Sequence, residues 1–486
     1  MNLKSRFVDI VGSDNVSDDP ILLETYAKDH SFIPKRSPLL VVFPRSRQQV
    51  QEIVKLANDV KIPIVPVSSG PPRFRGDTVP ALSGIIIDFS RMKKIMRIDP
   101  VNRYVRVEPG VTYGDLIPEL RKLGLRLNIP LLPRFSKSVV TSYLEREPVV
   151  IPKYQYDYID PLLTAEVVFG TGDIFRTGSA SGPGPFEMLK ADGVNPWGPG
   201  SIDFIRFLSG AQGTMGLVTW ATIKVEVIPT LQKLYFIPSE NLSKLVGLAD
   251  KLLRMRVPDE CLIVNNIFFA KILAQSQEEY ERLKADLPAW FSLICLAGFR
   301  RYPEERISIM EKYLKDVSDE LKLHMLTTLT GAEGKEKEIL ELLSSAWVKD
   351  PYWKIKFGRS CQDIFFLTSL SRAPMFTKIM AEIDTKFGHC VGDIGCYIQP
   401  LVQGRGCHCE FHISYDESRP QEVEKVKTFF MYASETLMRN GAFFSRPYGL
   451  WAEMVYGQYA EGVNALRKLK MIFDPNNILN PGKLCF

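Results

Sequence analysis

Two apolar runs flank an amphipathic segment near the start of the chain, and this pattern constrains the fold most. Residues 39–43 (LLVVF) and 62–67 (IPIVPV) have the length and the continuous apolar character of short buried strands. Between them, residues 46–61 place apolar side chains at helical spacing, and Ser46 is a suitable N-cap. The sequence therefore predicts a strand–helix–strand unit, which belongs to a fold that mixes helices and sheets.

The elements that follow are mostly strands at first, and helices alternate with strands from about Lys233 onward. We expect strands over 84–88, 104–110 and 220–227, a hairpin of 164–169 with 173–177, a loop over 179–200, and helices over 113–123 (closed by Gly124), 242–255 and 278–284. From about Gly441 the pattern changes to loop, helix and a terminal turn. We therefore predict an α+β protein in which residues 1–230 and 441–486 form one domain and residues 231–440 form a second, inserted domain.

The composition is that of a globular protein and excludes several classes. The 486 residues carry a net charge of +5, and the 61 basic residues form no long run, so we expect neither nucleic-acid binding nor a polybasic membrane anchor. No apolar run reaches the roughly 18 residues that span a bilayer, and the first residues lack a secretory signal. The eight cysteines have no framework-like spacing. We therefore expect a cytoplasmic protein with reduced thiols and no transmembrane segment.

Four segments, taken together and in their order, carry a family resemblance. They are PIVPVSSGPPRFRGDTVP (63–80), SVVTSYLEREPVVIP (138–152), FLSGAQGTMGLVT (207–219) and DPNNILNPGK (474–483). They resemble the flavin-binding framework of the superfamily of vanillyl-alcohol oxidase and 4-cresol methylhydroxylase, which also includes D-lactate and glycolate dehydrogenases. The resemblance covers both ends of the chain and is weak in the middle.

The resemblance implies an FAD-binding domain of two subdomains with an inserted α+β substrate domain, and FAD as the cofactor. The absence of a strand-linked Gly-x-Gly-x-x-Gly motif disfavours NAD in its place. Each segment also has a plainer interpretation: a rigid surface turn, an amphipathic segment or a terminal turn.

A phosphate-binding loop needs small residues whose backbone N–H groups can approach the phosphate oxygens closely. Ser68, Ser69 and Gly70 supply such a turn, but the two prolines that follow have no N–H to donate. We therefore expect the loop to bind phosphate with fewer amides, or Arg73 and Arg75 to compensate by charge. In register with the other three segments, the resemblance implies five further cofactor-binding residues: Ser138, Ser142, Gly213, Val218 and Lys483.

The segment GAFFSR (441–446) resembles the superfamily segment whose arginine lies beside the flavin and the substrate. The resemblance makes Arg446 a candidate catalytic and substrate-binding residue, since a permanent cation there would favour the anionic reduced flavin and hold a substrate anion. A surface arginine is the alternative. In the phenol-oxidising branch a tyrosine precedes this arginine, and here the position is Ser445. That branch also has an aspartate about where Pro133 and Arg134 stand, so we expect an anionic substrate that Arg134 helps to bind.

His408, Glu410 and His412 alternate along a predicted strand and therefore share one face of it. We predict that this face lies over the flavin and supplies the catalytic base. A divalent metal site built from the same three side chains is an alternative, because imidazole and carboxylate are suitable ligands. The His-x-Gly-Asp-Gly-Asn-x-His string of the metal-dependent 2-hydroxy-acid dehydrogenases is absent. A solvated strand face is the third interpretation.

The predicted activity is that of an FAD-dependent dehydrogenase. It would take a hydride from a hydroxyl-bearing or activated carbon of an anionic small molecule, such as a 2-hydroxy acid. The electrons would pass to a partner, for which we expect an iron–sulfur or electron-transferring flavoprotein subunit; a homo-oligomer is left open. Alternatives are a non-catalytic relay flavoprotein subunit, a phenol-type enzyme resembling the alcohol oxidases and methylhydroxylases, and a lyase or transferase that reuses the fold.

Overall fold

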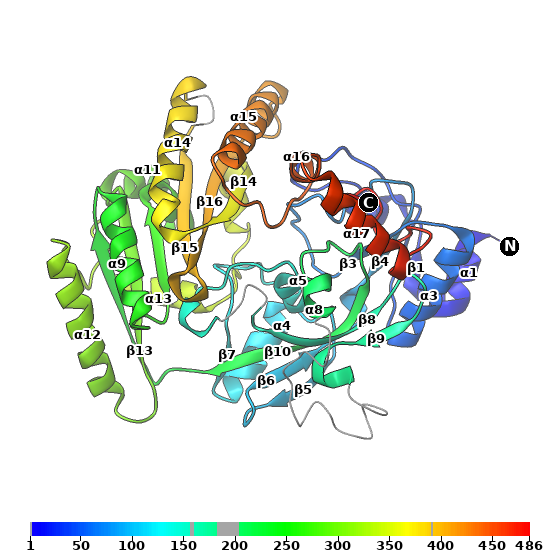
Figure 1. Ribbon diagram of the computed structural model, residues 1–486, viewed down its shortest axis with the longest axis horizontal. Helices are drawn as coiled ribbons and strands as arrows, with labels where there is room; N and C mark the ends of the chain where they lie inside the picture. The colour runs from blue at the N-terminus through cyan, green and yellow to red at the C-terminus, as the bar shows by residue number, and fades with distance from the viewer. Residues whose placement is uncertain (1, 156–159, 182–203, 390–391) are drawn as a thin grey trace.

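The computed structural model describes residues 2–155, 160–181, 204–389 and 392–486. They form three sheets. The third sheet and its helices make one end of the molecule, and the first two sheets make the other, where both termini also lie (Figure 1). The arrangement is the α+β fold predicted from the sequence.

The first sheet is built on the predicted strand–helix–strand unit. Strands β2 (Leu40–Val42) and β3 (Ile64–Val67) each pair in parallel with β4 (Ile85–Asp88), and the two-residue strand β1 (Val16–Ser17) closes one edge. Helix α3 (Arg47–Val60) connects β2 to β3, and Ser46 Oγ accepts a hydrogen bond from Gln49 N at 3.3 Å, so the predicted N-cap is confirmed. Helices α1 (Leu3–Val11) and α2 (Pro20–Ala27) precede the unit.

The second sheet is antiparallel and centres on a long strand. Its order is β5 (Ile95–Asp99), β6 (Tyr104–Val107), β10 (Leu217–Val227), β8 (Leu162–Val168) and β9 (Ile174–Arg176), with β7 (Leu125–Leu127) also paired to β10. The predicted hairpin is β8 with β9, and the helix closed by Gly124 is α4 (Tyr113–Lys122). Short helices α5 (Val139–Leu144) and α8 (Phe204–Leu208) pack beside the sheet. The predicted loop over 179–200 starts in the helical turn Gly178–Ser181, and residues 182–200 lie outside the described residues.

The third sheet is antiparallel throughout and is covered on both faces. Its order is β11 (Leu231–Pro238), β13 (Trp290–Gly298), β12 (Cys261–Asn265), β15 (Ile394–Leu401), β16 (Gly406–Tyr415) and β14 (Ser360–Thr368). One face packs against α9 (Leu242–Arg254), α12 (Pro303–Glu320), α14 (Ala373–Lys386) and α15 (Pro420–Arg439). The other packs against α10 (Asn266–Leu273), α11 (Gln277–Asp286) and α13 (Glu336–Ser344). The predicted helices over 242–255 and 278–284 correspond to α9 and α11.

The last part of the chain returns to the first two sheets. After α16 (Leu450–Tyr456) and α17 (Ala460–Phe473), Leu479 forms a parallel bridge with Ile64 of β3. The side chain of Lys483 donates to the carbonyl oxygen of Gly76 at 2.7 Å, across 407 positions of sequence. The predicted domain boundaries near residues 230 and 440 stay predictions. Within the described residues, none of the helices has both the length and the apolar character needed to cross a bilayer.

Candidate active site

An elongated cavity lies where the three sheets approach one another. Its walls come from the loop after β3, the loop of residues 130–137, helix α5, the turn before β10, and side chains in the middle of β14, β15 and β16. The predicted site residues that line it are Ser68, Ser69, Arg75, Arg134, Gly213, Val218, Glu410 and Arg446. The cavity therefore joins segments that lie at opposite ends of the sequence.

The end of the cavity between the first two sheets is built for close backbone approach. Backbone N–H groups of Ser68, Ser69 and Gly213 donate to no acceptor within the part of the chain that the structure describes. Gly213 has φ +72°, and a Cβ atom there would lie 2.2 Å from Pro66 Cγ. Free amides beside small side chains are what a pyrophosphate group requires.

The same end has an apolar lining that suits a flat ring system. The side chains are those of Val67, Phe89, Val140, Leu144, Leu208, Leu217 and Val218. Free amides next to apolar walls fit a dinucleotide that carries both phosphates and aromatic rings. On this observation the residues present fit FAD.

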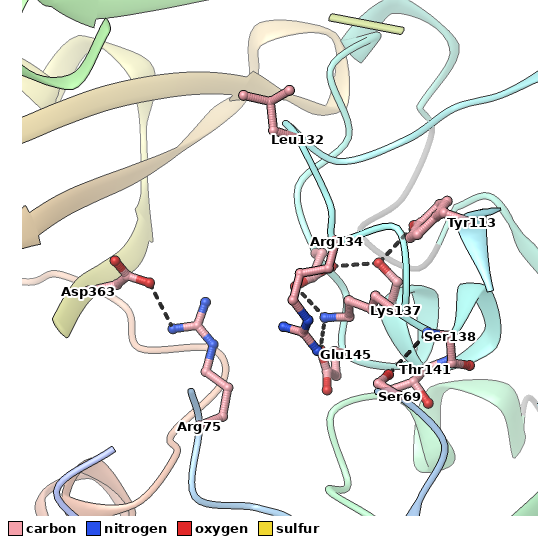
Figure 2. A network of polar contacts seen from close by, with 12 residues as sticks. Ser69, Arg75, Tyr113, Leu132, Arg134, Lys137, Ser138, Thr141, Glu145 and Asp363 are labelled. Carbon is pink, nitrogen blue, oxygen red and sulfur yellow. Dashed lines mark hydrogen bonds and ion pairs between the residues drawn. The ribbon is translucent and has the colours of Figure 1, made fainter. Parts of the chain in front are cut away.

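Four predicted cofactor contacts lie behind the cavity wall and do not line it. Ser138 Oγ donates to the carbonyl oxygen of Pro109 at 2.6 Å, and Ser142 Oγ donates to a Glu147 carboxylate oxygen at 2.5 Å. The N–H of Gly70 donates to Ser136 O at 3.0 Å, and Lys483 donates to the Gly76 carbonyl. Figure 2 shows how the Ser138 N–H donates to Ser69 Oγ, at 3.0 Å. These four residues hold the loops that line the cavity.

Arg75 does not extend along its own loop toward Ser69, as the proposed compensation for the two prolines would require. Its guanidinium turns to the third sheet and lies 3.6 Å from Asp363 Oδ2 (Figure 2). Its Cζ also stacks 4.2 Å from the centroid of the Phe365 ring. Arg75 therefore belongs to the end of the cavity formed by β14 and β16.

Arg134 and Lys137 stand on the opposite wall, on the loop that follows Leu132 (Figure 2). Arg134 lies in the cavity, and its Nη2 reaches the Gly70 carbonyl oxygen at 3.4 Å. Lys137 Nζ pairs with Glu145 at 2.7 Å and with Glu147 at 2.6 Å. Although burial opposes ionisation, Lys137 and Arg446 lower the pKa of Glu147 to about 2. The sequence analysis missed this ion-pair cluster.

The strand carrying His408, Glu410 and His412 is β16, and all three side chains are buried, with exposed fractions of 1%, 3% and 3%. The interpretation as a solvated strand face is therefore wrong. His408 Nε2 lies 2.8 Å from Glu410 Oε2, and His412 Nδ1 lies 2.6 Å from Asp363 Oδ1 on the neighbouring strand β14. Of the three predicted residues only Glu410 lines the cavity.

Two further side chains, which the sequence analysis missed, complete this group. Lys354 Nζ lies 2.5 Å from Asp363 Oδ2 and 2.8 Å from Glu410 Oε1. Tyr397 donates its hydroxyl proton to Glu410 Oε2 at 3.0 Å. Burial alone would raise the pKa of Glu410, but Lys354 and the hydrogen bond from His408 hold it well below its usual value. In the resting site Glu410 is therefore an ionised carboxylate that accepts hydrogen bonds.

Arg446 forms no ion pair within 4 Å among the described residues, although its charge helps to lower the pKa of Glu147. It is 4% exposed and lines the cavity, so the interpretation as a surface arginine is wrong. The Cζ of Arg446 lies 4.3 Å from the centroid of the Phe365 ring, and the guanidinium of Arg75 stacks on the same ring. No carboxylate among the described residues forms an ion pair with its guanidinium, and none of their atoms accepts a hydrogen bond from it. A buried, unpaired guanidinium facing a cavity is a site for an anion.

The fold and the cavity define a flavoprotein oxidoreductase, and comparison with known proteins agrees. Residues 38–178 match the FAD binding domain family, and residues 402–484 match the C-terminal domain of FAD linked oxidases. The chain is 24% identical to glycolate oxidase subunit GlcD of Bacillus subtilis (99% of this chain, 96% of the relative). It is also 24% identical to the 4-cresol dehydrogenase [hydroxylating] flavoprotein subunit of Pseudomonas putida (98% and 94%).

The fold is that of a solved structure of p-cresol methylhydroxylase with substrate bound. The TM-score is 0.83 at 22% identity, and the match covers 99% of this chain and 96% of that one. The two matched segments give this chain an FAD binding domain and the C-terminal domain of FAD linked oxidases, and FAD is its cofactor.

Proposed function

We propose that this protein oxidises the hydroxyl-bearing carbon of a small carboxylate, such as a 2-hydroxy acid. The observation that carries the proposal is the unpaired, buried guanidinium of Arg446 in the cavity wall. A carboxylate is the planar anion that a guanidinium binds best, with two parallel hydrogen bonds. The relative named glycolate oxidase subunit supports the same class of substrate.

Charge balance favours an anion over a neutral phenol. Arg75 and Lys354 are already neutralised by Asp363 and Glu410, and Lys137 pairs with both Glu145 and Glu147. With Arg446 and Arg134 included, these cations exceed these carboxylates by one charge, which an anionic ligand would balance. The similarity to 4-cresol dehydrogenase makes a phenol-type substrate the second candidate.

In the proposed reaction, Arg446 binds the substrate carboxylate and fixes the orientation of the carbon to be oxidised. FAD, when bound, accepts the two electrons that leave this carbon. Tyr397 accepts the proton of the substrate hydroxyl and passes its own proton to Glu410, whose Oε2 already accepts that hydrogen bond at 3.0 Å. His408 Nε2 lies 2.8 Å from the same oxygen and helps to hold Glu410 in place.

Aromatic side chains line this end of the cavity. Tyr352, Trp353 and Tyr397 line it, and the hydroxyl of Tyr352 and the indole nitrogen of Trp353 both donate to the Leu132 carbonyl oxygen, at 3.0 and 3.3 Å. These bonds tie the loop carrying Arg134 to the third sheet. Exclusion of water would strengthen the contact between Arg446 and a carboxylate.

The electron acceptor is proposed to be a protein. Two relatives are named as subunits, which supports a partner chain, and an iron–sulfur or electron-transferring flavoprotein subunit is our proposal for it. A cytoplasmic location stays a prediction.

The test is anaerobic reduction of the purified, FAD-loaded protein. We expect glycolate, D-lactate, L-lactate or mandelate to bleach the flavin absorbance at about 450 nm. 4-Cresol and vanillyl alcohol serve as neutral phenolic comparisons. Bleaching by the phenols alone would overturn the carboxylate proposal in favour of a phenol-type enzyme. Reduction by a partner flavoprotein or iron–sulfur protein, without bleaching by any small molecule, would favour a relay subunit.

A further inference from the structure

A single ammonium group stands at the centre of the buried cluster on β14 and β16. Lys354 Nζ contacts Asp363 Oδ2 at 2.5 Å and Glu410 Oε1 at 2.8 Å. His412 lies against the same two carboxylates, with Nδ1 2.6 Å from Asp363 Oδ1 and Nε2 3.3 Å from Glu410 Oε1. We call these four residues, Lys354, Asp363, Glu410 and His412, the lysine cluster.

Without the lysine, the remaining side chains are a set of metal ligands. Carboxylate and imidazole bind Zn²⁺, and a thiol is also within reach, because Cys361 Sγ lies 3.3 Å from Asp363 Oδ1. One ligand atom each from Cys361, Asp363 and His412 lies within 4.8 Å of the others. Ligand atoms around a tetrahedral zinc ion are about 3.4–3.8 Å apart, given the usual metal–ligand lengths. Small side-chain movements would therefore bring these atoms into coordination.

Charge decides whether a metal or the lysine occupies the cluster. The two carboxylates are balanced by Lys354 and by Arg75, which lies 3.6 Å from Asp363. A divalent ion added to this arrangement would leave two uncompensated positive charges in a buried place, which is strongly unfavourable. Without the lysine, the two carboxylates and Arg75 carry a net negative charge. A divalent ion would reverse that charge, and its binding would cost far less free energy than in the unaltered protein.

We propose that Lys354 is the resident cation of this site: its ammonium occupies the position of a divalent metal and holds Asp363 and Glu410 for a reaction that needs no metal there. Lys354 is then a positioning residue. It neutralises the two carboxylates together with Arg75, so the charge of Arg446 is not needed to balance them and stays available for a ligand. This last consequence rests on the function proposed above, whereas the exclusion of metal does not.

The test replaces Lys354 and measures zinc directly. We expect Lys354→Ala to retain one zinc per chain after gel filtration and to bind Zn²⁺ about 100-fold more tightly than the unaltered protein in calorimetry. Lys349→Ala is the matched control, because Lys349 is a partly exposed lysine that pairs with Glu338 at 3.1 Å outside the cluster. It should bind zinc no better than the unaltered protein. The double variant Lys354→Ala/His412→Ala should lose the gained zinc.

Three results would overturn the proposal: one tightly held zinc per chain in the unaltered protein, no gain of zinc in Lys354→Ala, or a gain that survives the His412 substitution. Bound flavin, read from the visible spectrum, reports whether each variant is folded. Lys354→Ser is the second variant if Lys354→Ala is not recovered, since it leaves the same space open. If the unaltered protein oxidises no hydroxy acid, the proposed function fails, but the zinc result still decides the role of Lys354.

Discussion

Lys470 and Asp474 form a buried ion pair at the end of α17, with Nζ 2.6 Å from Oδ2 and side-chain exposures of 3% and 0%. The carboxylate of Asp474 also accepts from the N–H groups of Ile478 and Leu479, at 3.0 and 2.8 Å. Lys470 donates to the carbonyl oxygens of Thr214 and Leu479. The pair thus fixes the returning segment to the turn before β10.

We expect Asp474→Ala to lower the free energy of unfolding by about 3–5 kcal/mol, because it leaves the Lys470 ammonium buried without its partner. Urea denaturation followed by circular dichroism measures this change. Glu435→Ala is the control, since its exposed pair with Arg439 should contribute less than about 1 kcal/mol. If both substitutions lowered the free energy of unfolding equally, the buried pair would contribute no more to stability than the exposed pair.

Arg446 provides the second prediction. Replacement by Gln should raise the KM for the oxidised carboxylate by about 10- to 100-fold, because one charge-assisted interaction with the substrate is lost. Arg446→Lys should recover only part of this loss, since an ammonium cannot form the two parallel hydrogen bonds. Steady-state kinetics with an artificial electron acceptor gives both values. A KM unchanged in Arg446→Gln would remove Arg446 from substrate binding.

Gly213 provides the third prediction. Gly213 has φ +72°, and an added Cβ atom would lie 2.2 Å from Pro66 Cγ. Any side chain is therefore unfavourable there. We expect Gly213→Ala to lose about 1–3 kcal/mol of stability and much of its bound flavin. Gly247→Ala is the matched control, because Gly247 lies within helix α9 and a Cβ there meets nothing within 4 Å.

Gly247→Ala should raise the free energy of unfolding by about 0.5–1 kcal/mol and leave the flavin content unchanged. Thermal unfolding measures the change in stability, and the ratio of visible to ultraviolet absorbance measures the flavin content. Full flavin content in Gly213→Ala would contradict the assignment of this turn to the cofactor cradle.

The fourth prediction concerns pH. Burial lowers the pKa of His408 to about 4 from its ordinary 6.5, so the folded protein keeps the imidazole neutral. Between these two values the unfolded chain binds more protons, and the free energy of unfolding therefore falls as the pH drops from about 6.5 to about 4. The contribution of His408 is on the order of 3 kcal/mol.

Urea denaturation at several pH values should show this loss, and His408→Gln should reduce the slope in that window. His324→Gln is the control for the same substitution at an exposed position. An identical slope in His408→Gln would assign the acid sensitivity to other groups.

Much of the fold could be predicted because its signals are local. The apolar runs of β2 and β3, the spacing of α3 and its Ser46 cap each act within a few residues. The alternation along β16 likewise placed His408, Glu410 and His412 on one face, and the structure confirms that they share a face away from the helices packed on Cys407, Cys409 and Phe411.

The candidate site depends on pairings that the sequence does not specify. Lys354 meets Asp363 and Glu410 only because β14 pairs with β16 in the register that sets Asp363 opposite His412. The one available signal was a charged residue, Asp363, which follows Gln362 in the strand CQDIFFL and precedes four apolar residues. The direction of Arg75 was missed because a loop, unlike a strand or helix, does not fix where its side chains point.

The bridge between Ile64 and Leu479 has a consequence for biosynthesis. A nascent chain still emerging from the ribosome has already made the first strands, but it lacks the partner of Ile64 and the lysine that fastens the Gly76 carbonyl 407 positions earlier. Stable cofactor loading must therefore wait until residues 479–483 have been synthesised.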